Sequence, residues 1–168
     1  MIELRLCKVL IAASLALFAD LVAIDNVLDY GSNYNFVSHV LSMDTTFPDN
    51  ALRWRAITQP VLWHLAYLII ILGEALTGAA YTIGSIALLR SLRASGATFN
   101  RAKRSIYLAT AAGFLVWFLG FMVIGGEWFS MWQSPTWNGQ QAAFRFYVAV
   151  LGAGIFIALE DRDLARPA

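Results

Sequence analysis

The sequence predicts an all-α integral membrane protein, a four-helix bundle with short amphipathic helices in its first outer loop. Of its 168 residues, 59% are hydrophobic and only 14% are charged, whereas soluble domains have roughly 45–50% apolar and roughly 25% charged residues. The mean hydropathy is +0.61. Four apolar runs are each close to the ~20 residues that cross a bilayer as a helix. Together these observations exclude an ordinary soluble globule and a disordered chain.

We expect the four runs to form a single transmembrane domain over residues 1–168. They cover about residues 7–28, 60–89, 106–126 and 142–159. Helix is the expected state, because an isolated strand would leave its backbone groups unpaired in lipid. The second run would be about 45 Å long at 1.5 Å per residue, so it should tilt or project beyond the bilayer. Pro60 suits the first turn of that helix.

The distribution of Lys and Arg predicts the orientation. Nine basic residues would lie on one side of the membrane and three on the other. The nine are Arg5, Lys8, Arg90, Arg93, Arg101, Lys103, Arg104, Arg162 and Arg166, and the three are Arg53, Arg55 and Arg145. By the positive-inside rule both termini are expected in the cytoplasm. We expect the first run to be retained, because Leu17 stands where a cleavage site after Ala19 would need a small residue.

The first outer loop, residues 29–59, has apolar residues at helical spacing. One set follows Asn35 and a second follows Asp49. The sets are Phe36, Val37, Val40 and Leu41, then Ala51, Leu52, Trp54 and Ile57. This pattern predicts two short amphipathic helices on the membrane surface or over the bundle. A strand from Phe36 to Met43 is the alternative. Residues 91–100 should form a short cytoplasmic loop.

Small and polar residues should mark the faces that look into the bundle, because packing and polar contacts hold helices together in lipid. In the third run, Gly113, Gly120 and Glu127 recur every seven residues. In the fourth, Arg145 and Gly152 have the same spacing. We therefore expect both stripes to face inward.

Two carboxylates fall inside predicted spans. Asp20 and Glu74 lie near the middle of the first and second runs, with Tyr67 and Tyr81 on the same stripe as Glu74. An ionised carboxylate is costly at that depth. One interpretation is a proton or cation relay. The other is a protonated carboxyl group that hydrogen-bonds to a neighbouring helix and holds it in register.

A second polar cluster is expected at the outer boundary of the membrane, formed by Asp25, His64, Glu127 and Arg145. Because the short outer loop joins the third and fourth runs, Glu127 and Arg145 should form an ion pair that clamps the two helices. A membrane enzyme that acts on a lipid or quinone through His64, Glu127 and Arg145 is a less favoured interpretation, because no nucleophile or metal set accompanies them.

Tryptophans crowd the same side. Trp54, Trp128, Trp132 and Trp137 fit either an aromatic belt at the lipid headgroups or a surface for a partner protein, quinone or lipid. His39 and His64 are the only histidines. Two histidines can ligate a haem iron or, with nearby carboxylates, a zinc ion, but the spacing of His39 and His64 is not diagnostic of either site. We therefore assign no catalytic, cofactor or metal site.

Four strings of the sequence resemble a known family. They are FVSHVLSMDTTF at 36–47, GGEWFSMWQS at 125–134, WNGQ at 137–140 and AFRF at 143–146. They resemble the bacterial family of predicted small integral membrane proteins known as domain of unknown function 2165. The resemblance implies a multi-pass protein of the bacterial inner membrane with four helices, and it implies no activity.

The function expected from these observations is that of a non-enzymatic accessory or assembly subunit of a larger membrane complex. The alternative is a small proton- or cation-coupled transporter or channel that uses Asp20 and Glu74. The expected partners are the lipid bilayer and either another membrane protein or further copies of this chain. A net charge of +1 provides no basic field for nucleic acid.

Overall fold

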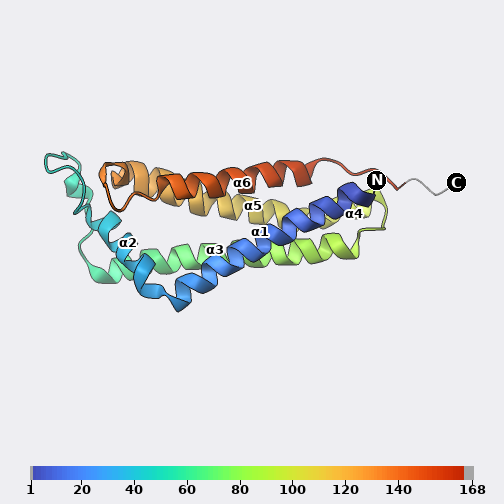
Figure 1. Ribbon diagram of the computed structural model, residues 1–168, viewed down its shortest axis with the longest axis horizontal. Helices are drawn as coiled ribbons and strands as arrows, with labels where there is room; N and C mark the ends of the chain where they lie inside the picture. Colours follow the sequence, from blue (N-terminus) through green and yellow to red (C-terminus); the bar gives the residue numbers. More distant parts are fainter. Residues whose placement is uncertain (1, 165–168) are drawn as a thin grey trace.

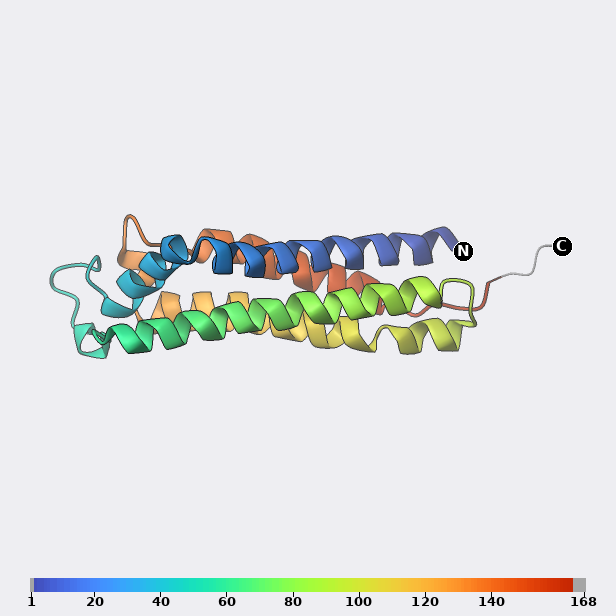
Figure 2. The same ribbon diagram turned by 90° about the horizontal axis from the view of Figure 1, so that it is seen from below.

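The computed structural model describes residues 2–164, and four helical rods run side by side through it (Figures 1 and 2). Three rods are single helices, α1 (Ile2–Leu28), α3 (Pro60–Arg90) and α6 (Gln140–Ala158). The third rod in chain order joins α4 (Gly96–Ala102), α5 (Arg104–Phe114) and the π-helix η2 (Leu115–Trp128). No strand occurs in residues 2–164. The all-α bundle with four candidate spans is confirmed.

The start of α1 and the end of α6 lie at one end of the bundle, here called the terminal end (Figure 1). The opposite end, here called the cap end, carries α2 (Tyr30–Ser42) and the longer loops. The assignment of the terminal end to the cytoplasm stays a prediction. One of the nine basic residues behind it, Arg166, lies outside the described residues.

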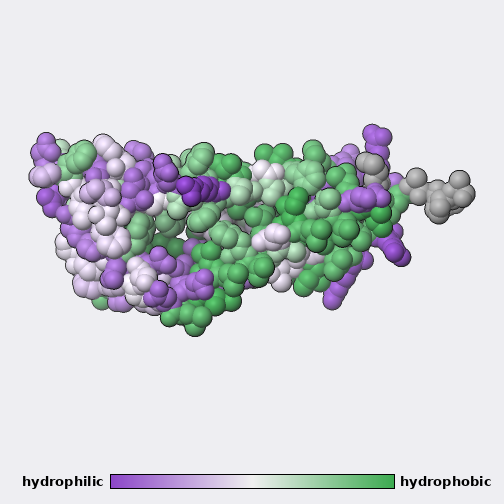
Figure 3. All heavy atoms as spheres, viewed as in Figure 1, coloured by the Kyte–Doolittle hydropathy of each residue, from purple (hydrophilic) through white to green (hydrophobic). Residues whose placement is uncertain are grey.

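The surface of the bundle suits a bilayer. Figure 3 shows a hydrophobic surface along the middle of the molecule and hydrophilic groups at both ends. Large apolar side chains of all four rods are exposed there, among them Leu17, Ile69, Leu108 and Ile155. Lipid is the environment in which such a surface is stable.

The largest helix–helix interface lies between α1 and α3. On α1 it includes the buried Ala12 and Ala16, which belong to one packed cluster with Tyr81 and Leu88 of α3. On α3 it includes Gly78, where an added Cβ would collide with the side chain of Asp20. Small residues on both helices let the two backbones approach closely, which is how helices associate in lipid.

The residues of the stripe predicted on the third rod, Gly113, Gly120 and Glu127, do not all face the interior of the bundle. Gly113 is buried against Trp117, Thr77 and Val150, but Glu127 is exposed. The helix is α-helical only as far as Phe114 and π-helical from Leu115 onward. Because a turn closed by i→i+5 bonds holds more residues than an α turn, a seven-residue spacing no longer returns to the same face.

The predicted inward stripe on α6 was also wrong. Arg145, Ala149 and Gly152 are all exposed, and nothing lies within 4 Å of a Cβ added at Gly152. The opposite face is buried instead, at Ala143, Val150, Gly154 and Ile157. Small residues permit close packing but do not require it, so their spacing alone did not identify the packed face.

The first loop contains one α-helix. The structure places α2 at Tyr30–Ser42, directly after α1, and its apolar residues Val37, Val40 and Leu41 are buried. The alternative strand is therefore wrong. The second predicted helix is reduced to turns and a single 3₁₀ turn, η1 (Arg53–Arg55). The Asn50 side chain accepts a hydrogen bond from the Leu52 backbone N–H at 2.8 Å, which favours a turn there. Residues 91–100 are a loop only as far as Ser95, since α4 begins at Gly96.

The two loops at the cap end, together with the last residue of η2, are joined into one layer, here called the cap (residues 29–59 and 128–139). Gln133 lies in the 3₁₀ turn η3 (Met131–Gln133). Its Oε1 accepts hydrogen bonds from the Phe47 backbone N–H at 3.1 Å and from the Asn50 amide at 3.0 Å. Thr45 and Ser134 hydroxyls pair at 2.8 Å. These bonds connect segments more than 80 residues apart in the sequence and make the cap a single folded unit.

Candidate functional site

A cavity of about 430 Å³ lies inside the cap half of the bundle, between α1, α2, α3, η2 and α6. It exists because α1 crosses the bundle obliquely and diverges from α6 toward the cap end (Figure 1). Figure 3 shows the surface hollowed between these elements. Its volume falls within the roughly 300–1,000 Å³ of known ligand sites.

The floor of this cavity is polar and is organised around Asn26. The Asn26 amide donates to Glu74 Oε2 at 2.6 Å. The Asn26 Oδ1 accepts from the Asn33 amide at 2.5 Å and from the Tyr67 hydroxyl at 3.2 Å, and that hydroxyl also reaches the Asn26 carbonyl at 3.0 Å. Because Oδ1 is engaged by two donors, the NH₂ group of Asn26 is directed at Glu74. Glu74 is only 3% exposed.

The intramembrane carboxylates sit in separate contacts along the α1–α3 interface. Asp20 accepts a hydrogen bond from Thr82 at 2.9 Å and lies against Gly78. Gly78 is one helical turn along α3 from Glu74, or about 6 Å along the axis. Tyr67 shares Asn26 with Glu74, whereas the Tyr81 hydroxyl pairs with Thr110 at 3.0 Å. Thus Glu74 and Tyr67 belong to one polar group, and Asp20 and Tyr81 belong to two others.

The residues of the predicted outer-boundary cluster do not meet. Asp25 lines the cavity. His64 Nδ1 pairs with the Tyr30 hydroxyl at 2.8 Å and its ring stacks on Tyr34. Glu127 and Arg145 are exposed and form no ion pair with described residues. The predicted ion pair between them was therefore wrong. The π-helical register of η2 and the outward face of α6 direct the two side chains elsewhere.

The two histidines serve different contacts. His39 pairs with Asp44 at 2.7 Å and stacks on Trp137 with ring centroids 4.6 Å apart. His64 lies in the tyrosine contacts just described. In residues 2–164 no three His, Cys, Asp or Glu side chains gather as a metal-binding group.

Three of the four predicted surface tryptophans form exposed pairs on the cap. Trp54 is 72% exposed and meets Trp128 edge to face, with centroids 6.3 Å apart. The Arg55 guanidinium lies over both rings, 4.4 Å from the Trp128 centroid and 5.3 Å from that of Trp54. Trp132 meets Phe47 edge to face. Trp137 is half-buried against Phe36 and His39 and so is a packing residue of the cap.

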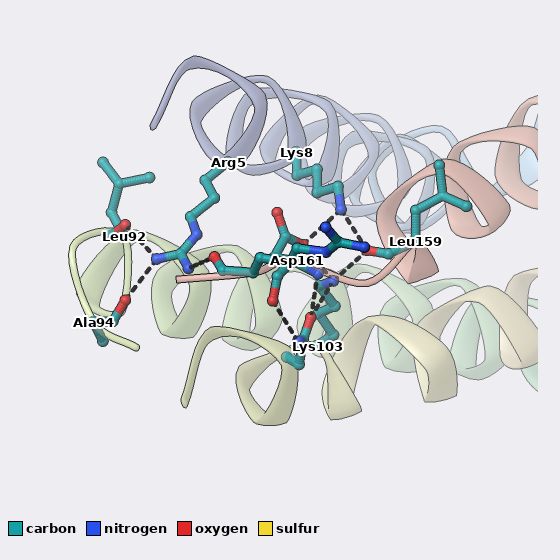
Figure 4. Close-up of polar contacts among 9 residues, drawn as sticks. Arg5, Lys8, Leu92, Ala94, Lys103, Leu159 and Asp161 are labelled. Carbon is teal, nitrogen blue, oxygen red and sulfur yellow. Dashed lines mark hydrogen bonds and ion pairs between the residues drawn. The ribbon is translucent and has the colours of Figure 1, made fainter. Parts of the chain in front are cut away.

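A buried ionic network, here called the terminal clamp, closes the other end of the bundle (Figure 4). Asp161 accepts from Lys8 at 2.6 Å and from Lys103 at 2.5 Å, and both lysine side chains are 0% exposed. The same two ammonium groups also reach the Leu159 carbonyl. The clamp therefore ties the first turns of α1 and the start of α5 to the segment after α6.

Further hydrogen bonds extend the terminal clamp. Arg5 donates to the carbonyl oxygens of Leu92, Ala94 and Arg162 at 2.7–3.0 Å. Asn100 exchanges two hydrogen bonds with the Asp161 backbone, at 2.9 and 3.0 Å. Side chains of α1 and α4 thus hold the loop after α3 and the segment after α6 in place.

This clamp was not predicted from the sequence. Arg5, Lys8 and Lys103 were interpreted only as charges that set the topology, and Asp161 was not a candidate residue. A usable signal was present: Lys8 stands at the start of one apolar run and Asp161 two residues after the end of another, on the same predicted side of the membrane. Opposite charges at one depth would have to pair if the helices were neighbours.

The comparison with protein families agrees with the architecture. The family model described as "Predicted small integral membrane protein (DUF2165)" matches residues 4–160. The chain belongs to this family. The match begins in the first turn of α1 and ends two residues after α6, so the resemblance seen in the four strings holds for all four helical rods. No curated protein and no solved structure matches the chain.

Proposed function

We propose that this DUF2165 protein is a non-enzymatic accessory or assembly subunit of a larger membrane complex. The observation that carries the proposal is the aromatic surface of the cap, where Arg55 packs between Trp54 and Trp128. Trp and Arg are the residue types that most often dominate the binding energy of protein interfaces.

The hydrogen bonds that join the two cap loops support the same proposal. Gln133 and the Thr45–Ser134 pair hold the two loops together, and Arg55 donates to the Trp128 carbonyl at 3.3 Å. A surface ordered before binding loses less conformational entropy when a partner docks. The cap therefore has the properties of a preformed docking surface for another membrane protein.

The test is to extract the tagged protein gently from its own membranes, measure the native mass and identify every co-migrating chain. We expect a stoichiometric membrane-protein partner. Trp54→Ala should reduce its recovery more than about tenfold, as expected for a central interface residue. Phe144→Ala is the matched control, because Phe144 is an exposed aromatic residue on α6 outside the cap. A monomer, or equal recovery with both variants, would contradict the proposal.

A second candidate function is proton- or cation-coupled transport. It is favoured by Asp20 and Glu74, two carboxylates about one turn apart on the α1–α3 interface that form no ion pair with described residues. Beyond them toward the terminal end the bundle is packed by Leu88, Ile106 and Ile157. Transport through one copy would therefore require these helices to move.

Ion flux in proteoliposomes tests this second candidate. The wild-type protein should dissipate an imposed cation or proton gradient, and Glu74→Gln should abolish that flux because it removes the titratable group and preserves the shape. Arg145→Gln, on the exposed face of α6, is the control and should retain it. Unchanged flux in Glu74→Gln would rule out the carboxylate mechanism.

A further inference from the structure

We propose that the cavity in the cap half of the bundle is a binding site for an amphiphile with an ammonium head and an apolar body. The inference is independent of the accessory-subunit proposal, because it concerns the interior of the bundle and not the surface of the cap. It rests on the charge of the cavity, the positioning of Glu74 and the aromatic wall opposite.

The charge of the cavity is one-sided. The carboxylates of Glu74 and Asp25 line it, and none of the described residues that line it is basic. Burying a carboxylate away from a compensating charge is costly. A bound cation would supply the compensation that the chain itself does not provide there.

Glu74 is positioned to receive such a group. Its Oε2 is held by the Asn26 amide at 2.6 Å, and the Asn26 side chain is in turn held by Asn33 and Tyr67. The second oxygen, Oε1, has no hydrogen-bond donor among the described residues, and Glu74 faces the cavity. An ammonium N–H can therefore reach Oε1 without displacing a protein bond.

The wall of the cavity suits the rest of the ligand. Phe36, Trp117, Phe121 and Phe146 contribute aromatic surface. Trp117 meets Phe146 edge to face at 5.7 Å, and Phe18 packs against both rings from behind. The rings are thus held in place. Aromatic faces attract alkylammonium groups and bury apolar chains, whereas a hydrated metal ion would gain nothing from them.

The position of the opening favours an amphiphile over a small hydrophilic amine. The cavity lies where α1 and α6 diverge, within the apolar length of both helices. A molecule already dissolved in the bilayer can reach it sideways with its head toward the polar floor. The same chemistry is offered by a free alkylammonium compound and by a lipid with an amine headgroup, and the experiment separates the two.

The experiment uses the full chain in nanodiscs of phosphatidylglycerol, a lipid without an amine. Dodecylammonium, whose head carries N–H donors, is titrated by calorimetry, with empty nanodiscs subtracted and dodecanol as the neutral counterpart. We expect saturable binding of the cation only. Glu74→Gln should weaken it about tenfold to a hundredfold, the range for losing a hydrogen bond to a charged group. Asp20→Asn is the matched control, since Asp20 is an intramembrane acid that does not line the cavity, and it should bind as the wild type does.

In a second arm, nanodiscs contain phosphatidylethanolamine, and native mass spectrometry records which lipid stays bound. Retention of one phosphatidylethanolamine by the wild type and its loss in Glu74→Gln assigns the site to a lipid headgroup. Binding of dodecylammonium without lipid retention assigns it to a free amphiphile. Absence of saturable binding in both arms, or equal affinity of the wild type and Glu74→Gln, would overturn the proposal.

The wall provides a test that does not alter the carboxylate. Phe121→Ala should weaken binding about tenfold, because an aromatic residue contributes both buried area and ring interaction. Phe118→Ala is its control, since Phe118 packs on Phe114 and Tyr147 outside the cavity. If Glu74→Gln does not fold, equal affinities of these two variants would overturn the proposal.

Discussion

Asp161→Ala is expected to lower the free energy of unfolding by about 3–5 kcal/mol, the cost of breaking a buried ion pair by removing one partner. The substitution leaves two ammonium groups, those of Lys8 and Lys103, buried with 0% exposure and without a counter-charge. The Leu159 carbonyl still accepts from both, but a neutral oxygen does not compensate two charges. The effect should be large because the contacts of Asp161 hold together α1, the start of α5 and the segment after α6.

Chemical unfolding in detergent measures this loss. Glu160→Ala is the matched control, because Glu160 is the exposed neighbour of Asp161, and its stability should change by less than about 0.5 kcal/mol. Asp161→Asn keeps the shape and removes the charge, so it should also be destabilised. Equal stability of Asp161→Ala and Glu160→Ala would show that the terminal clamp contributes nothing.

The pH dependence of the clamp provides a second readout of the same prediction. Burial by itself raises the pKa of the Asp161 carboxyl, but hydrogen bonds from Lys103 and Lys8 and their charges outweigh it and lower this pKa below its usual value. The contribution of Asp161 is therefore complete above the pKa of the unfolded chain, about 3.9, and is lost as the pH falls below it. Asp161→Asn should lack this acid-dependent loss of stability.

Gly78→Leu is expected to destabilise the bundle by about 3 kcal/mol, the upper part of the usual range for overpacking. A Cβ at Gly78 would already collide with the Asp20 carboxylate and lie 2.9 Å from the Asp20 backbone nitrogen. The backbone of α1 cannot move aside without opening the alanine-lined interface with α3. The change should also disturb the hydrogen bond from Thr82 to Asp20.

The control for this prediction is Gly152→Leu on α6. Nothing lies within 4 Å of a Cβ added there, so the larger side chain should enter lipid with a change within about 0.5 kcal/mol. Unfolding of both variants under the same detergent conditions makes the comparison. If both glycines tolerate leucine equally, close approach of α1 and α3 is not what holds the bundle together.

The two glycines also show what a sequence pattern can predict. Gly78 follows Glu74 by four residues on α3, and Gly152 follows Arg145 by seven residues on α6. Of the two glycines, only Gly78 is packed. The predicted inward face of α6 was wrong because the spacing of small residues does not identify the helices against which α6 packs. In the third rod the π-helical stretch Leu115–Trp128 changed which residues share a face, and its hydrophobic sequence does not distinguish it from an α-helix.

Some polar residues of the candidate sites were predicted from the sequence, and others were not. Glu74 and Tyr67 were singled out because a carboxylate in a span is costly, and they share Asn26 in the structure. Asn26, which organises the cavity floor, was not singled out, because an amide near the end of a span gives no unusual signal. Asp161 was missed for a similar reason: a carboxylate just beyond a span normally lies in water.

Composition and run length alone determined that this chain is an all-α protein with four helices able to span a bilayer, because apolar segments of that length have no other way to satisfy their backbone in lipid. Only the tertiary structure decided which faces pack, that α1 and α6 diverge around a cavity, and that Lys8 and Lys103 converge on Asp161. Those features depend on contacts between residues more than 50 positions apart, and no local pattern specifies the angle at which two helices cross.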